Sequence, residues 1–112
     1  LWGNAGTDSL WGGSAADRLY GGAGNDRLWG GSGADAFVFE GGRDRVEDFE
    51  DGVDAIRLDA DLWGGRLISA TAALGFAGLE GGNAVFRFSG GNVLIVEGMT
   101  SLQRLRDDLE VV

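Results

Sequence analysis

Five aspartates stand nine residues apart in the first half of the chain: Asp8, Asp17, Asp26, Asp35 and Asp44. Each ends a glycine-rich stretch and is followed two residues later by an apolar side chain, which is aromatic in one case, Phe37. Carboxylate oxygens are the ligands that hard cations such as calcium prefer. Carboxylates held close together also repel one another. The spacing therefore predicts a metal site if the fold brings these side chains near each other.

The composition narrows the chemistry further. The chain has 112 residues, 18 of them acidic and 9 basic, for a net charge of -9, and it contains no His and no Cys. Zinc, haem, iron–sulfur and thiol chemistry are therefore excluded, as is a Ser-His-Asp triad. The acidic balance argues against a nucleic-acid partner. No apolar run has the length of a membrane span, and no signal peptide is recognised at the amino terminus.

The aspartates belong to a nine-residue repeat, Gly-Gly-x-Gly-x-Asp-x-apolar-x. Four copies follow one another: GNAGTDSLW (3–11), GGSAADRLY (12–20), GGAGNDRLW (21–29) and GGSGADAFV (30–38). FEGGRDRVE (39–47) is a degenerate fifth copy, and DFEDGVDAIRL (48–58) slips by one residue. Leu1 and Trp2 fit the last two positions of an earlier copy. Since the chain starts without Met, we expect it to be part of a longer polypeptide.

This repeat predicts an all-β fold, a parallel β-roll or right-handed β-solenoid over residues 1–58. Six glycine-rich residues can turn tightly, and three can then run extended with the middle side chain pointing inward. Nine residues make half a coil, so alternate copies stack into two parallel sheets. The expected inward residues are Leu10, Leu19, Leu28, Phe37, Val46 and Ile56.

Stacking would place the aspartates in two columns: Asp8, Asp26 and Asp44 on one edge, and Asp17, Asp35 and Asp54 on the other. Adjacent strands lie roughly 4.8 Å apart. Two carboxylates at that spacing repel by about 3 to 4 kcal/mol at an effective dielectric of about 20. A core with one apolar side chain per repeat is too thin to offset this repulsion. Calcium between neighbouring loops would reverse its sign, because the turns add carbonyl oxygens to the carboxylates.

GGAGNDRLW and GGSGADAFV resemble the calcium-binding nonapeptides of the RTX (repeats-in-toxin) family. The stretch 30–59 resembles the end of the roll in serralysin-type proteases, alginate epimerases and related proteins. The end of the chain, NVLIVEGMTSLQRLRDDLEVV, is similar to the flanking segment that closes such rolls. In that family this segment also carries an uncleaved signal for type I secretion.

The resemblance implies a ligand set for each ion. One loop gives the carbonyls of positions one and three with its aspartate, and the loop eighteen residues on gives those of positions two and four with its own. The implied sites, three or four in number, are Gly3, Ala5 and Asp8 with Gly22, Gly24 and Asp26; Gly12, Ser14 and Asp17 with Gly31, Gly33 and Asp35; Gly21, Ala23 and Asp26 with Glu40, Gly42 and Asp44; and Gly30, Ser32 and Asp35 with Asp48 or Asp54. Asn4 and Ala15 replace glycines, and the Cβ of Ala15 is expected to strain its turn and weaken the second site.

Residues 59–112 are expected to form a cap that closes the roll and carries the secretion signal. AVFRF (84–88) and VLIVE (93–97) predict a β-hairpin around SGGN. Thr100 and Gln103 form a capping-box pattern that opens a short helix, with Leu102 and Leu105 on its buried face. LEVV is a candidate last strand. Asp59–Trp63 is a candidate helical turn, and LISATAAL is compatible with a strand or a helix.

The sequence thus predicts a non-catalytic, calcium-folded module of a secreted, extracellular protein. Its expected partners are calcium, upstream domains of the same polypeptide and the type I secretion machinery. An alternative is a module that binds glycans or cell surfaces through the aromatic residues at position nine, Trp2, Trp11, Tyr20 and Trp29. Those rings are equally compatible with stacking on one another. An enzyme fragment is a third, weaker interpretation, because no pair of carboxylates points into an obvious cleft.

Overall fold

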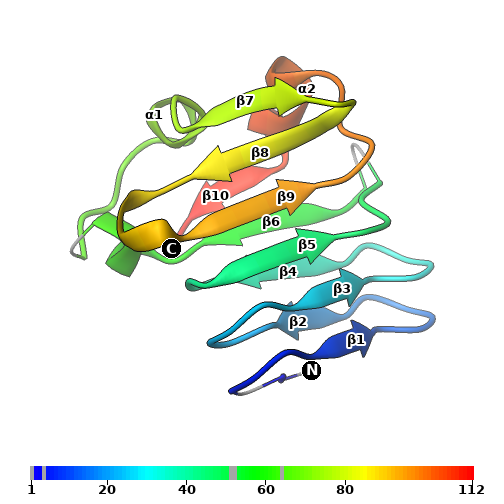
Figure 1. Ribbon diagram of the computed structural model, residues 1–112. Helices are drawn as coiled ribbons and strands as arrows, with labels where there is room; N and C mark the ends of the chain where they lie inside the picture. The colour runs from blue at the N-terminus through cyan, green and yellow to red at the C-terminus, as the bar shows by residue number, and fades with distance from the viewer. Residues whose placement is uncertain (1, 4, 51–52, 64) are drawn as a thin grey trace.

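The computed structural model describes residues 2–3, 5–50, 53–63 and 65–112 and contains two facing sheets (Figure 1). Among the described residues, one sheet has the strand order β1 (Ser9–Trp11), β3 (Arg27–Trp29), β5 (Arg43–Val46), β9 (Val93–Val96), β8 (Asn83–Arg87) and β7 (Ala77–Glu80). The other has the order β10 (Leu109–Val111), β6 (Ala55–Leu58), β4 (Ala36–Phe39) and β2 (Arg18–Tyr20). We refer to them as the six-stranded and the four-stranded sheet.

The two sheets arise from the alternate stacking that the repeat predicts. Leu10 pairs with Leu28 and Leu28 with Val46, both in parallel register, so β1, β3 and β5 lie one coil apart. On the other side Leu19 pairs with Phe37, and Phe37 pairs with Ile56 across the one-residue slip. The parallel β-roll is therefore confirmed, including the coil that the slip lengthens.

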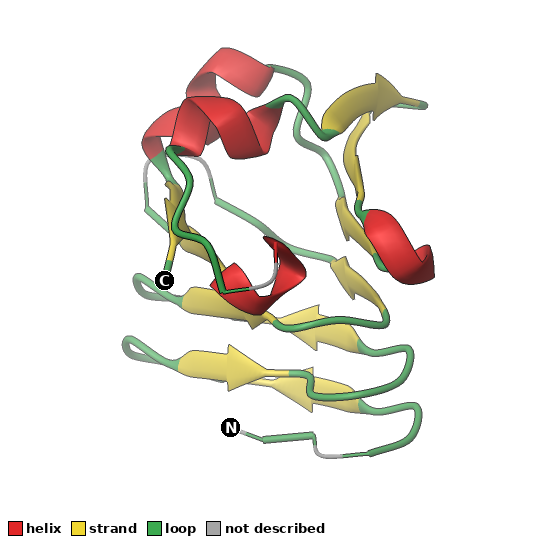
Figure 2. Cartoon of the chain, turned by 90° about the vertical axis from the view of Figure 1, so that its left-hand side faces the viewer, coloured by secondary structure: helices red, strands yellow, loops and turns green. Residues whose placement is uncertain are grey.

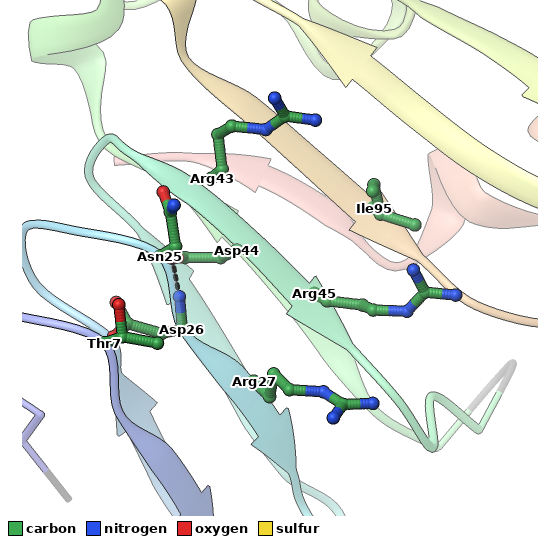
Figure 3. A pocket seen from close by; sticks show the side chains of 8 residues that line it. All are labelled: Thr7, Asn25, Asp26, Arg27, Arg43, Asp44, Arg45 and Ile95. Atoms are coloured by element: carbon green, nitrogen blue, oxygen red, sulfur yellow. Dashed lines mark hydrogen bonds between the residues drawn. The ribbon is translucent and has the colours of Figure 1, made fainter.

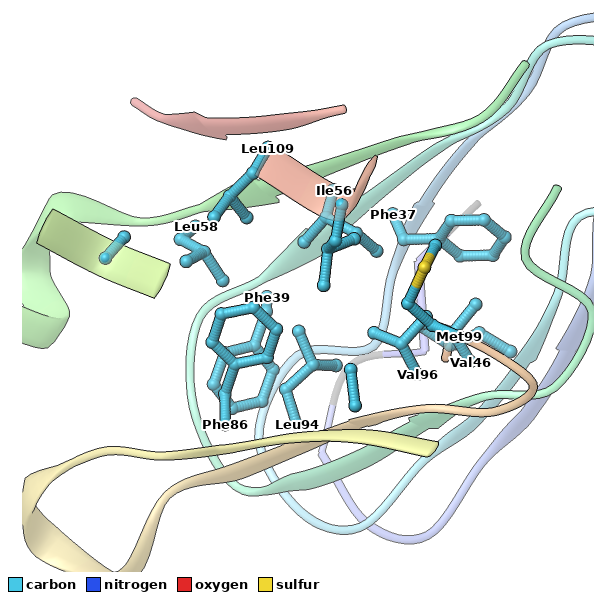
Figure 4. Close-up of a cluster of buried hydrophobic side chains, with 14 of the residues drawn as sticks. Phe37, Phe39, Val46, Ile56, Leu58, Phe86, Leu94, Val96, Met99 and Leu109 are labelled. Carbon is cyan, nitrogen blue, oxygen red and sulfur yellow. The ribbon is translucent and has the colours of Figure 1, made fainter. Parts of the chain in front are cut away.

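The eighth position of each repeat points between the sheets, as expected. Leu19, Leu28, Phe37, Val46 and Ile56 are at most 1% exposed and belong to the core cluster. Figure 4 shows Phe37, Val46 and Ile56 of this set. Leu10 is only partly buried, because it lies in β1 at the edge of its sheet. The two sheets contribute these residues from both sides, and β4 and β6 add Phe39 and Leu58 to the same core.

The C-terminal half extends both sheets. β8 and β9 form the expected antiparallel hairpin, and β9 also pairs in parallel with β5. β10 pairs in parallel with β6, so the chain ends as a further strand of the four-stranded sheet. β7, which the sequence did not indicate, pairs antiparallel with β8. Phe86, Leu94 and Leu105 join the same apolar cluster as the roll, so the core is continuous across residue 58 (Figure 4).

The helices α1 (Ala70–Leu74) and α2 (Leu102–Asp107) cover the end of the roll farthest from the N-terminus (Figure 2). Two 3-10 turns lie elsewhere: η1 (Ala60–Trp63) follows β6, and η2 (Ser89–Gly91) joins β8 to β9. Within LISATAAL, Ala70–Leu74 is helical with Ser69 as its N-cap, and Asp59–Trp63 contains the expected helical turn. In the described part of the chain, no helix is long and apolar enough to span a membrane.

The expected start of α2 is wrong by one residue. Ser101, not Thr100, is its N-cap, and the Ser101 hydroxyl accepts a hydrogen bond from Arg104 N at 3.4 Å. The two hydroxyl residues are neighbours, and either can cap a helix. With Met99 buried just before the turn, the register is set by packing rather than by the capping pattern.

Candidate calcium-binding loops

The aspartates of alternate repeats stack in two columns and are linked by hydrogen bonds along each column. Asp8 N donates to Asp26 Oδ1 at 3.0 Å, and Asp26 N donates to Asp44 Oδ1 at 3.1 Å. The other column has the same arrangement: Asp17 N donates to Asp35 Oδ1 at 2.9 Å, and Asp35 N to Asp54 Oδ1 at 2.9 Å. One oxygen of each later aspartate is therefore used to join two coils.

The second carboxylate oxygen of most of these residues has no partner. The Oδ2 atoms that are buried without a hydrogen bond belong to Asp8, Asp17, Asp26, Asp35 and Asp44. A buried carboxylate oxygen without a donor is costly, because it has lost its water and gained nothing in exchange. The five atoms share one position of the repeat, so they indicate a site that recurs from loop to loop.

The first glycine of each repeat leaves room beside these oxygens. A Cβ on Gly21 would stand 2.7 Å from Asp26 Oδ2 and 2.9 Å from Asp44 Oδ2, so both orphaned oxygens face one point. A Cβ on Gly3 would stand 2.7 Å from Asp8 Oδ2 and 2.7 Å from the Gly21 carbonyl oxygen. Gly12 has the same relation to Asp17 Oδ2 and Gly30 O, at 2.8 and 2.6 Å. Glycine is needed at these positions because a Cβ would overlap the neighbouring oxygens, and not because the backbone has a positive φ.

Backbone carbonyls also point into the gaps between stacked loops. The carbonyl oxygens of Gly6, Ala15 and Gly24, at position four, face the same position of the next loop, where any Cβ would overlap them. Gly13 O, at position two, faces Gly31 in the same way. Gly21 O and Gly30 O, at position one, face back toward the preceding loop.

This direction is the reverse of the one that the family resemblance implied. The earlier loop presents positions two and four to the gap, and the later loop presents position one. Carbonyls alternate in direction along an extended chain, and the sequence does not tell which set points forward. For the first site the structure therefore offers Gly6 and Gly21 in place of Gly3 and Gly24; Asn4 lies outside the described residues.

The structure brings other expected ligands together as well. A hollow of about 320 Å³ separates two stacked loops and is lined by Gly22, Ala23, Gly24, Glu40, Gly41 and Gly42. Glu40 is exposed at its rim. Ala5, Ser14 and Ser32 lie on exposed turns, at position three of their repeats. Among the described residues, no three acidic side chains converge on one point, so two carboxylates would have to be completed by carbonyl oxygens.

The fourth expected site differs from the other three. Asp54 Oδ2 accepts a hydrogen bond from Glu50 N at 2.9 Å, so this carboxylate is satisfied within its own loop. Asp48 uses both oxygens, Oδ1 toward Gly30 N at 2.8 Å and Oδ2 toward Gly31 N at 2.9 Å. Asp48 thus fixes the preceding loop of the roll by hydrogen bonds, a role that the sequence did not indicate.

Asn92 is a further residue that sequence reasoning missed. Its Oδ1 accepts a hydrogen bond from Gly42 N at 2.9 Å. A neutral amide thus links the loop before β5 to the turn before β9, as the aspartates link the earlier loops. Asn92 was part of the expected hairpin turn SGGN. The available signal was the pair Gly90-Gly91 directly before a polar residue and an apolar strand, which resembles a turn of the roll as much as a hairpin.

Burial disfavours the negative charge of three of these aspartates, so a bound cation would stabilise their ionised form. Burial raises the pKa of Asp44 to about 8, and the hydrogen bond and charge of Asp26 act in the same direction. Burial also raises the pKa of Asp26 and that of Asp35. The residues fit calcium, which takes six to eight oxygens from carboxylates and carbonyls in flexible geometry.

Comparison with known proteins agrees with this geometry. Residues 1–18 and 11–46 match the family model of the RTX calcium-binding nonapeptide repeat, in four copies. The structure is similar to that of the extracellular lipase LipA from Serratia marcescens, with a TM-score of 0.75 and 26% identity. That match covers 100% of this chain but 18% of the lipase.

A second similar structure is the R3 subunit of the mannuronan C5-epimerase AlgE6 from Azotobacter vinelandii. It has a TM-score of 0.60 and 23% identity, over 97% of this chain and 70% of the subunit. A search of curated protein sequences finds no match. RTX nonapeptide repeats bind calcium, and residues 1–46, which fold as part of the parallel β-roll, match that repeat.

Proposed function

We propose that this chain is a non-catalytic, calcium-binding module of a larger secreted protein. The observation that carries the proposal is the set of five buried, unpartnered Oδ2 atoms, which recur at one position of the repeat. Two of them, on Asp26 and Asp44, face a single point beside Gly21. A bound cation would compensate these oxygens for the water that they have lost.

We infer three sites. Asp8 and Asp26 would hold the first, with the carbonyls of Gly6 and Gly21. Asp17 and Asp35 would hold the second, with those of Gly13, Ala15 and Gly30. Asp26 and Asp44 would hold the third, with that of Gly24. A fourth, beside Asp35, would have fewer free carboxylate oxygens, because Asp48 and Asp54 are already bonded to backbone amides.

Calcium supplies the charge that the stacked carboxylates need. Four divalent ions would bring eight positive charges to a chain of net charge -9. Only the folded chain stacks its loops, so only the folded chain has the sites. Each site filled at ten times its dissociation constant stabilises the fold by about 1.4 kcal/mol. Several sites that share aspartates would make folding a steep function of calcium concentration.

This coupling suits export of an unfolded chain. In a calcium-poor cytosol the aspartate columns repel one another, and the chain stays threadable; at the calcium levels outside the cell it folds. We assign the type I secretion signal to residues 59–112 and place a further domain elsewhere in the polypeptide. Support comes from the repeat family and from the likeness to an extracellular lipase. A passenger protein fused to residues 59–112, expressed with a type I exporter, should reach the medium, and one fused to residues 1–58 should not.

The aromatic residues are accounted for without a ligand. Trp2 stacks on Tyr20 at 3.9 Å, and Trp11 stacks on Trp29 at 4.5 Å, each pair within 5° of parallel. The rings thus cover one another along the coil axis and stiffen the first turns of the roll. We therefore put forward no second function on the aromatic residues alone.

Far-UV circular dichroism during a calcium titration of the EDTA-treated protein tests the proposal, with magnesium as the control. We expect a steep transition from disorder to β-structure with calcium alone, and calorimetry would then count the ions. A spectrum that is already folded in EDTA and unmoved by calcium would contradict the proposal.

A further inference from the structure

An arginine-lined hollow lies on the outer face of the six-stranded sheet (Figure 3). It measures about 320 Å³, and its lining includes Arg27 from β3, Arg43 and Arg45 from β5, Ile95 from β9, and Thr7 and Asn25 from the turns. Asp26 and Asp44 also border it, but their side chains are buried. The groups at the surface of the hollow are therefore three cations, two polar groups and one apolar side chain.

Two of these arginines are held in place by carboxylates. Arg27 Nε lies 2.6 Å from Glu47 Oε2, and Arg45 Nε lies 3.3 Å from Glu47 Oε1. Arg45 Nε also lies 3.1 Å from Glu97 Oε2. Both arginines make these ion pairs through Nε, so their Nη1 and Nη2 atoms take no part in them. Arg27 and Arg45 are partners in the strand register, so the two guanidinium groups project side by side.

Arg43 differs from both, since in the described part of the chain it makes no ion pair. Its side chain is exposed at the edge of the hollow, two residues before Arg45 on the same strand. Beside the three guanidinium groups lie the carboxylates of Glu47 and Glu97 and, buried beneath the hollow, those of Asp26 and Asp44, which calcium at the third site would neutralise. A surplus cation at a shaped site is unusual in a chain of net charge -9, and it favours a ligand that brings its own negative charge.

The chemistry of the lining narrows the class of ligand. Guanidinium forks bind carboxylates and sulfates through paired, charge-assisted hydrogen bonds. Thr7 and Asn25 offer a hydroxyl and an amide, which suit sugar hydroxyl groups. Arg27 also lies over the ring of Trp29, at 5.4 Å, which places an aromatic surface next to the cations. We propose that this hollow is a binding site for an acidic saccharide, carboxylated or sulfated.

The proposal does not depend on the number of calcium ions or on secretion. The side chains proposed to contact the saccharide are not among the proposed calcium ligands, although Asp26 and Asp44 of the third calcium site border the hollow. It requires only that the roll be folded, and circular dichroism in each sample shows whether it is. A failure of calcium-dependent folding and a failure of saccharide binding are therefore separate results.

The first test is calorimetric titration of the folded chain with hexasaccharides, in about 5 mM calcium so that the sites are filled. Hyaluronan supplies carboxylates, a heparin fragment supplies sulfates, and maltohexaose is the neutral control of the same size. A hexaglutamate peptide tests whether charge alone suffices. We expect at least one acidic saccharide to bind more tightly than both controls, and which one it is identifies the charged group.

Two variants locate the site. Arg43→Gln should raise the dissociation constant about five- to tenfold, the usual effect of losing one charge-assisted contact, and Arg43→Lys should restore part of the loss. Arg66→Gln, which removes the same charge from an exposed position in the cap, is the control. Thr7→Glu should weaken binding by repulsion, whereas Ala16→Glu, at the same repeat position on the other sheet, should not.

Three outcomes would overturn the proposal. The first is a folded chain that binds neither acidic saccharide. The second is equal binding of hexaglutamate, which would make the hollow a general anion or acidic-peptide site. The third is unchanged saccharide affinity in both Arg43→Gln and Thr7→Glu.

Discussion

Asp26 N donates a hydrogen bond to Asp44 Oδ1 at 3.1 Å, and Asp44 Oδ2 is left buried without a partner. One carboxylate thus has two separate roles: one oxygen sets the spacing between coils, and the other faces the gap beside Gly21. An amide in place of the carboxylate would keep the first role, because its oxygen still accepts the hydrogen bond, and lose the charge that the second role needs.

Asp26→Asn should therefore weaken calcium-coupled folding without removing the link between coils. Asp26 faces two of the proposed sites, so its loss should raise the calcium midpoint of folding about tenfold or more, equivalent to at least ~1.4 kcal/mol. Far-UV circular dichroism during a calcium titration measures the midpoint. Asp61→Asn removes the same charge at an exposed position and serves as the control. Equal midpoints for the two variants would show that Asp26 does not hold the ion.

Gly21→Ala should destabilise the calcium-bound roll through its methyl group alone. The new Cβ would stand 2.7 Å from Asp26 Oδ2 and 2.9 Å from Asp44 Oδ2, the point that both oxygens face. We expect a loss of about 1–3 kcal/mol in the free energy of unfolding, measured by urea denaturation in calcium.

Gly78→Ala is the matched control for that substitution. Gly78 lies in β7, has no left-handed backbone, and has no atom within 4 Å of the added Cβ. It should change stability by no more than about 0.5 kcal/mol. If Gly21→Ala is as mild as Gly78→Ala, the space beside the carboxylates is not needed.

Ala15→Gly should stabilise the roll. Ala15 occupies position four of its repeat with φ of 75°, and it is the only non-glycine residue with a positive φ in the described part of the chain. An L-residue in this conformation costs roughly 1–2 kcal/mol, so the glycine should gain about 1 kcal/mol after its own entropy cost. Ala16→Gly, next in the chain with an ordinary backbone, should lose about 0.5–1 kcal/mol. Thermal unfolding in calcium compares the two, and a loss in both would contradict the prediction.

The roll was predictable because its period is fixed by chemistry that the sequence displays. Glycine stands where the turn needs a positive φ or where a Cβ would not fit, and position eight carries a buried apolar residue. Together these two features leave one way to stack nine-residue units. Even the longer coil could be predicted, because Asp54 and Ile56 keep their spacing across the slip. The two aspartate columns followed directly from the same register.

The direction of the carbonyls and the end of the columns could not be predicted. Which carbonyls point forward depends on the peptide-plane orientation in each turn, and glycines such as Gly6 and Gly21 have no side chain that would indicate it. Asp48 and Asp54 have the same residue type as Asp44, but backbone amides of Gly30, Gly31 and Glu50 satisfy them. β7 was missed because Ala77–Glu80 contains glycine and has no alternating pattern.

Without calcium, the roll should become more stable as the pH falls. Burial raises the pKa of Asp44 from 3.8 to about 8 in the folded chain. A carboxyl group whose folded pKa is raised stabilises the fold below its unfolded pKa, near 4, and this stability is lost as the pH rises toward 8. The difference for Asp44 is on the order of 5 kcal/mol. In EDTA, β-structure measured by circular dichroism should therefore appear at about pH 4–5 and disappear by about pH 8.

Asp44→Asn supplies the control for this effect. The amide cannot ionise, so in EDTA the variant should lose much of the dependence between about pH 4 and pH 8 that the parent chain shows. The same variant should need more calcium to fold at neutral pH, because the third site has lost a charge. A parent chain whose stability in EDTA rises from pH 4 to pH 8 would show that the buried carboxylates are not the groups that oppose folding. Neutralisation by protons and neutralisation by calcium are thus two ways to relieve the same repulsion, and above about pH 8, where Asp44 is ionised, only calcium remains.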